Sequence, residues 1–61
     1  MTSTVTRIDG GRRIETEANH SGGYTIWIWP AAGSGLLDYR EVSHEGAVEQ
    51  AITEMLADLD A

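Results

Sequence analysis

The sequence predicts an α+β fold: an antiparallel meander sheet of three or four strands followed by one C-terminal helix (ββββα), in two layers. Three observations predict it. Glycine-rich turns separate segments of strand length in the first two thirds of the chain. Two independent hairpin alignments place apolar residues on one face of the sheet. The apolar period then changes to that of a helix near residue 43. With 61 residues, the chain is one domain, 1–61.

The turns are predicted from glycine. The pairs Gly10-Gly11 and Gly22-Gly23, and the stretch 30–35, supply the positive φ that tight connections need. Segments with the length and composition of strands lie before, between and after these turns. The predicted strands cover residues 4–8, 13–19, 24–29 and 36–42.

The pairing of the strands can be tested by alignment. A loop over 19–23 places Ile14 opposite Ile28 on one face. A connection over 30–35 then predicts that Leu36 pairs with Trp29, which places Leu37 opposite Ile28. The first strand stays open. A two-residue turn at Gly10-Gly11 puts Val5 and Arg7 on this face, whereas a three-residue turn puts Ile8 there.

The last third of the chain predicts a helix over residues 44–59. Apolar residues recur there at helical spacing: Val48, Ile52, Met55 and Leu59. Ser43 is the predicted N-cap, and Glu45 suits the first turn of a helix. At 1.5 Å per residue this helix is roughly 24 Å long, which matches strands of about 20 Å. Its apolar stripe can cover one face of the sheet.

The opposite face of the sheet is the predicted interface. The same registers place five residues there: Trp27, Trp29, Leu36, Arg13 and Val42. One helix covers only one face, so a second copy of the chain is the simplest cover, and we expect a homodimer. The alternative is that the helix covers the tryptophans and the isoleucines lie outside.

The charge is strongly acidic. Ten acidic residues against four arginines, with no lysine, give a net charge of −6. Glu49, Glu54 and Asp58 line the expected outer side of the helix and form a candidate acidic face for a basic protein partner. The alternative is an ordinary solvated face. The negative charge disfavours nucleic acid as a partner, because phosphate contacts need cations.

The sequence shows no catalytic constellation, so we expect a protein without enzymatic activity or cofactor. His20 and His44 are the two histidines, and their positions do not suggest a metal site. The absence of cysteine removes disulfides and thiolate sites. No apolar run is long enough to cross a membrane and the N-terminus lacks the apolar core of a signal peptide, so the expected location is cytoplasmic.

The stretch 22–30, Gly-Gly-Tyr-Thr-Ile-Trp-Ile-Trp-Pro, resembles the Gly-Tyr-aliphatic strand ending in proline of the HicB-like antitoxin family. Gly33 follows, as a glycine does in that family, and 42–48 resembles its strand exit into a helix. The resemblance covers roughly 13–59. The sequence departs from the family by about three extra residues between Pro30 and the helix, by an additional N-terminal strand, and by having no DNA-binding segment after the helix.

The resemblance implies a protein that binds and blocks a partner, as a dimer, without binding an operator. We therefore expect a small acidic protein-binding module that acts as an inhibitor or antitoxin-like sequestering protein. Two alternatives stay open. One is a phage-type inhibitor that mimics nucleic acid with its acidic surface. The other is a sheet domain that binds single-stranded nucleic acid through its aromatic residues.

Overall fold

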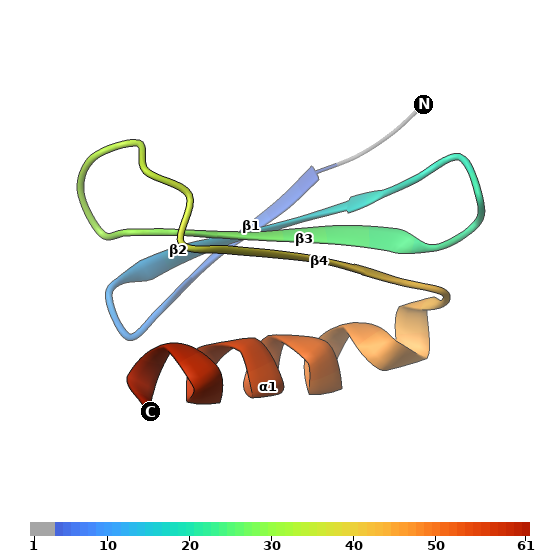
Figure 1. Ribbon diagram of the computed structural model, residues 1–61. Coiled ribbons are helices and arrows are strands. Elements are labelled where there is room, and N and C mark those ends of the chain that lie inside the picture. Colours follow the sequence, from blue (N-terminus) through green and yellow to red (C-terminus); the bar gives the residue numbers. More distant parts are fainter. Residues whose placement is uncertain (1–3) are drawn as a thin grey trace.

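A computed structural model describes residues 4–61. Four antiparallel strands form one sheet in the order β1-β2-β3-β4, and a short 3₁₀ turn and a helix follow (Figure 1). The predicted ββββα fold in two layers is confirmed. The elements are β1 (Thr4–Asp9), β2 (Arg12–Ala18), β3 (Tyr24–Trp29), β4 (Asp38–Val42), η1 (Glu45–Ala47) and α1 (Val48–Asp60).

The β1–β2 hairpin settles the alternative that the sequence left open. Gly10 and Gly11 both have positive φ, at 59° and 81°, as a two-residue turn between strands requires. Asp9 therefore pairs with Arg12, and Arg7 lies opposite Ile14. Val5 and Arg7 project to the side of the sheet that carries the core.

The β2–β3 hairpin has the predicted register, with Ile14 opposite Ile28. Its loop is held by Asn19, whose Oδ1 accepts hydrogen bonds from the backbone N–H groups of Ser21 (3.0 Å) and Gly23 (3.1 Å). A Cβ at Gly23 would lie 2.2 Å from the carbonyl oxygen of the β4 residue Val42. The close approach of this end of the loop to β4 therefore requires glycine.

The predicted β3–β4 register is wrong by one residue. Ile28 lies opposite Asp38 instead of Leu37, and Trp27 lies opposite Tyr39. Leu36 and Leu37 belong to the connecting loop, although the Leu37 N–H still donates to the Ile28 carbonyl at 2.8 Å. Because strand side chains alternate, this shift moves every side chain of β4 to the other face.

The physical reason for the shift lies in what β4 presents to the helix. As an edge strand, β4 needs no continuous apolar stripe. Its Arg40 extends along the helix side and its Nη1 lies 2.9 Å from the carboxylate of Glu54. Val42 packs against the core from the same face, and Tyr39 moves to the opposite face.

The core lies between the sheet and α1. Its fully buried side chains come from three elements: Ile14 from β2, Ile26 and Ile28 from β3, and Met55 from α1. Val48, Ala51 and Ile52 complete it. Burial of each large side chain contributes about 1.5–3 kcal/mol. The helix therefore covers the isoleucine face, and the alternative in which it covers the tryptophans is wrong.

The start of the helix differs from the predicted cap at Ser43. A single 3₁₀ turn comes first, in which the Ala47 N–H donates to the His44 carbonyl at 3.1 Å. His44 is in an extended conformation and makes no side-chain cap. The α-helix proper begins at Val48 and continues to Asp60, so both ends lie later in the chain than expected.

Candidate interaction surfaces

The side of the sheet that faces away from α1 carries a cluster of aromatic side chains. The strand registers place on it, from β1 to β4, Ile8, Arg13, Glu15, Trp29, Trp27 and Tyr39, and we call this surface the Trp face. Figure 1 shows no helix on this side of the sheet. The two tryptophans are half-buried, and Tyr39 and Ile8 are exposed by 49% and 64%. Large apolar groups on an uncovered sheet are typical of an interface.

Polar neighbours hold the aromatic rings of the Trp face in place. The indole N–H of Trp29 donates to Glu15 at 2.7 Å, and the guanidinium of Arg13 lies 5.9 Å from the centre of the same ring. The rings of Trp27 and Tyr39 are tilted by 51° with centroids 6.4 Å apart, a favourable aromatic pair. The face is therefore preorganised on strands.

The structure brings together three of the five residues predicted for this interface: Trp27, Trp29 and Arg13. Leu36 is exposed in the loop before β4, and Val42 lies on the helix side against the core, so neither belongs to the Trp face. Sequence reasoning missed Tyr39. The alternation of apolar residues in 36–42 is compatible with both registers, and only the paired strand decides between them.

The Trp face is negatively charged at its margin. Arg13 carries one positive charge, whereas Glu15, Glu17 and Glu41 carry three negative ones, which leaves a net charge of −2. The hydroxyl of Tyr39 donates to Glu41. This hydrogen bond, with smaller contributions from burial and from the charge of Glu41, raises the pKa of the Tyr39 phenol.

The three acidic residues predicted as one helix face do not form one surface. Glu49 pairs with Arg7 of β1 at 3.0 Å, and Glu54 pairs with Arg40 of β4. Since β1 and β4 are opposite edges of the sheet, these two glutamates lie on opposite flanks of α1. Asp58 lies one turn after Glu54 and is exposed.

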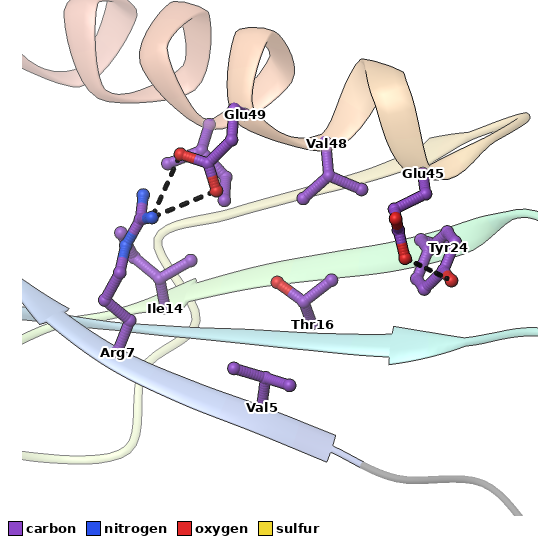
Figure 2. A pocket seen from close by; sticks show the side chains of 9 residues that line it. Val5, Arg7, Ile14, Thr16, Tyr24, Glu45, Val48 and Glu49 are labelled. Atoms are coloured by element: carbon purple, nitrogen blue, oxygen red, sulfur yellow. Dashed lines mark hydrogen bonds and ion pairs between the residues drawn. The ribbon is translucent and has the colours of Figure 1, made fainter.

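A groove lies between β1, β2 and the start of the helix, and sequence reasoning missed it. It has a volume of about 240 Å³ and a mostly apolar lining that includes Val5, Ile14, Val48 and Ile52. We call it the β1 groove. Figure 2 shows Val5 and Thr16 on neighbouring strands below the helical segment. A polar contact lies at each end of the groove, on either side of these two residues.

The two polar contacts close the ends of the β1 groove. At one end, the Arg7 Nη1 donates to both carboxylate oxygens of Glu49 at 3.0 Å (Figure 2). At the other, the Tyr24 hydroxyl donates to Glu45 at 3.2 Å. This hydrogen bond, followed by the charge of Glu45 and by desolvation, raises the pKa of the Tyr24 phenol above its usual value near 10.

The groove exists because one helix is narrower than four strands. Neighbouring strands lie about 4.8 Å apart, so the sheet is wider than a helix of about 10 Å diameter. The helix α1 packs mainly over β3 and β4. On the helix side of β1, Arg7 is half-buried and paired with Glu49, whereas Val5 is 64% exposed. The two-residue turn at Gly10-Gly11 was the signal that placed Val5 and Arg7 on this side.

The two histidines stand apart in the structure. His20 is exposed in the β2–β3 loop, and His44 is exposed before η1. Within residues 4–61, no group of three or more histidine or acidic side chains is arranged to hold a metal ion. Among the elements described, α1 is too short and too polar to cross a membrane.

Comparison of the chain with models of known protein families, with curated proteins and with solved structures found no match. The geometry of the two surfaces, the Trp face and the β1 groove, is therefore the basis for assigning a function.

Proposed function

We propose that this protein is a small non-enzymatic protein-binding module that works as a homodimer and acts as an inhibitor or antitoxin-like sequestering protein. The observation that carries the proposal is the Trp face. Two half-buried tryptophans and an exposed tyrosine lie on paired strands, with no helix over them in the part of the chain that the structure describes. Aromatic side chains of this kind dominate the binding energy of protein interfaces.

A second copy of the chain suits the Trp face for two reasons. The face carries Arg13 beside Glu15 and Glu17, so a two-fold axis can place the guanidinium of one copy near a carboxylate of the other. A domain of about 60 residues also buries only about 60% of its unfolded surface, so it gains stability from an additional interface.

The charge of the Trp face argues against nucleic acid as its ligand. Bases stack on exposed aromatic rings, but such sites add a positively charged groove along the phosphates. Here the margin carries a net charge of −2 and the whole chain −6. Outside the dimer interface, the net charge of −6 per chain favours a protein with a basic surface as the sequestered partner. The form of sequestration that we propose is an antitoxin-like role on the pattern of the HicB family.

Light scattering after size exclusion tests the dimer. The parent protein should show about twice the chain mass of 6.6 kDa at micromolar concentration. Trp27→Asp, which places a carboxylate in the centre of the face, should give a folded monomer. Thr53→Asp is the control, because Thr53 is exposed on α1, away from the Trp face, and should leave the dimer intact. A monomeric parent whose indoles are both quenched by acrylamide would contradict the proposal.

Fluorescence anisotropy tests the nucleic-acid alternative. Labelled single- and double-stranded oligonucleotides should show no binding at about 0.15 M salt. Saturable binding of a single strand that is lost in Trp27→Ala would favour the alternative in which the sheet stacks bases.

A further inference from the structure

Within residues 4–61, no strand pairs with the outer edge of β1. The sheet order places β1 at one edge, and its six residues pair continuously with β2 from Thr4 to Asp9 without a bulge. Alternate backbone N–H and C=O groups of an edge strand point away from its neighbour and can pair with an added chain. Thr4–Asp9 contains no proline, lysine or bulge; its two charged residues are Arg7, which is paired with Glu49 on the helix side, and Asp9, which ends the strand.

The β1 groove lies directly beside this edge. Val5 and Arg7 project to the helix side, so a strand added beside β1 would present every second side chain on that side, about 5 Å from its neighbours. Of the apolar lining of the groove, Val5 is 64% exposed at this edge, whereas Ile14, Val48 and Ile52 are buried. An extended segment could therefore form backbone hydrogen bonds with β1 and bury an aliphatic side chain in the groove.

The charge at the groove selects the partner. Its lining holds one guanidinium, Arg7, and two carboxylates, Glu45 and Glu49, so its net charge is −1. Arg7 is already engaged with Glu49, which leaves the exposed carboxylate of Glu45 with one hydrogen bond from Tyr24. A lysine or arginine suits this position. A second copy of the chain that paired through the same edge suits it less, because it would bring two grooves of net charge −1 together.

We propose that the β1 edge and the β1 groove together bind an extended basic segment of a protein partner, which adds to the sheet as a fifth strand. One aliphatic side chain of the segment lies beside Val5 at the mouth of the groove, and a neighbouring lysine or arginine on the same face approaches Glu45. The inference rests on the proposed function in one respect, namely that the protein acts by binding another protein. It assigns the site and the chemistry of the partner.

The test uses a synthetic peptide of about seven residues, titrated into the ¹⁵N-labelled protein. Isoleucine and lysine take turns at every second position, so that both lie on one face of the added strand, and threonine fills the positions between them. Saturable shifts of the β1 amides and slower hydrogen exchange of the outward N–H groups of β1 are expected. A peptide of the same sequence, methylated on the backbone nitrogens that face β1, should bind about tenfold more weakly or not at all, because it lacks the bonds of strand addition. A peptide with glutamate in place of lysine should not bind.

A pair of matched variants locates the site. Val5 and Ile8 lie on the same strand and are both 64% exposed, but Val5 faces the groove and Ile8 the Trp face. Val5→Lys should weaken peptide binding about tenfold, through repulsion of the basic peptide and loss of apolar contact, and should leave the dimer intact. Ile8→Lys adds the same charge to the same edge strand but on the Trp face, so it should weaken the peptide's binding clearly less than Val5→Lys does. Amide spectra of both variants verify that the fold is retained.

A second pair isolates the charge. Glu45→Gln should weaken the binding of the peptide, and more strongly at low than at high ionic strength. Asp58→Asn removes the same charge from the far part of α1 and should have little effect on the binding.

Several results would overturn the inference. These are equal binding of the methylated and parent peptides, equal binding by Val5→Lys, or peptide-induced shifts confined to the Trp face. If the peptide does not bind and Val5→Lys halves the mass, the β1 edge is covered by a second copy instead. The inference then fails while dimerisation through the Trp face is judged separately from Trp27→Asp. Conversely, a monomeric parent that binds the peptide at β1 contradicts the proposed dimer and supports the inference.

Discussion

The two faces of β3 use apolar residues in different ways. On the helix side, Ile26 and Ile28 are fully buried against α1. On the other side, Trp27 and Trp29 are half-buried, and polar groups hold Trp29 in place: Glu15 accepts from its indole N–H, and Arg13 lies over its ring. The aliphatic face is closed by its own chain and contributes to folding. The aromatic face is ordered but open, which suits binding.

The arginines follow the same division. Three of the four arginines tie the sheet to the helix, in the pairs Arg7–Glu49, Arg12–Asp60 and Arg40–Glu54. Arg13 alone lies on the Trp face, where it contacts a ring. The helix side is thus an aliphatic core with ion pairs on both flanks. The Trp face carries an excess of carboxylates and has one cation to offer a partner.

The largest expected effect is in the closed face. Ile52→Ala should lower the free energy of unfolding by about 2–5 kcal/mol, because Ile52 is 3% exposed and its truncation leaves a cavity between α1 and the sheet. In a domain this small, such a loss can abolish folding. Ile8→Ala, at 64% exposure on the open face, should change stability by less than about 0.5 kcal/mol in the monomer. Urea unfolding followed by circular dichroism compares the two, and similar losses would show that the two faces do not differ.

A smaller effect is expected on the Trp face. Glu15→Ala removes the acceptor of the partly buried Trp29 N–H and should cost about 1 kcal/mol, with a red shift of tryptophan emission as the indole loosens. Glu17→Ala, on the same face of β2, removes only an exposed hydrogen bond from Thr4 and should leave the emission unchanged. A blue shift or unchanged emission in Glu15→Ala would indicate that packing, rather than this hydrogen bond, fixes Trp29.

Much of the fold could be predicted from the sequence because local signals agree with the long-range pattern. The turn at 19–23 and the placement of Ile14, Ile26 and Ile28 on one face of the sheet determine the β2–β3 register. The periodic residues from Val48 onward predict the helix and its buried side. Together these also indicate that the tryptophans lie on the uncovered face.

The β4 register and the β1 groove could not be predicted, for physical reasons. The loop 30–37 contains no helix or strand that would fix its length, so the register of β4 depends on contacts of the folded sheet, such as the Arg40–Glu54 pair. The groove arises from the width of the sheet relative to one helix, which is a property of the assembled layers. Glu49 and Glu54 pair with opposite edges of the sheet and are therefore separated. This separation also depends on how the two layers are assembled.

The flanks of the helix allow a finer comparison. Glu54→Lys breaks the pair with Arg40 and places two cations together, so it should cost up to about 1 kcal/mol, the range of exposed ion pairs. Asp58→Lys, one turn later, puts a cation near the helix C-terminus, where it should be neutral or stabilising by a few tenths of a kcal/mol. Thermal unfolding at low salt measures the difference in stability between the two variants. This difference should become smaller at about 1 M salt, which screens exposed charges. Equal effects would show that Glu54 is as free as Asp58.

The smallest expected effect is on the pKa values of two tyrosines, Tyr24 on the helix side of the sheet and Tyr39 on the Trp face. Both phenols bond to a glutamate, and both pKa values are raised above the usual value near 10, first by the hydrogen bond itself. Tyr24 joins β3 to the helical segment through Glu45, whereas Tyr39 bonds to Glu41 within β4. Absorbance at alkaline pH should therefore show both titrating above 10, and Tyr24→Phe and Tyr39→Phe assign the two transitions. Glu45→Gln should lower the pKa of Tyr24 and leave that of Tyr39 unchanged.

The consequence for stability differs between the faces. A phenol whose pKa is higher in the folded than in the unfolded protein stabilises the fold fully below the unfolded value near 10, and this contribution is lost as the pH rises through the folded value. On the helix side, ionisation of Tyr24 should repel Glu45 and loosen the η1 turn from the sheet, so hydrogen exchange at Val48 and Glu49 should accelerate there. Ionisation of Tyr39 affects Glu41 of β4 and the neighbouring ring of Trp27, both away from α1, and should leave those amides protected. Equal acceleration in Tyr24→Phe and the parent would show that the Tyr24–Glu45 bond does not hold the start of the helix.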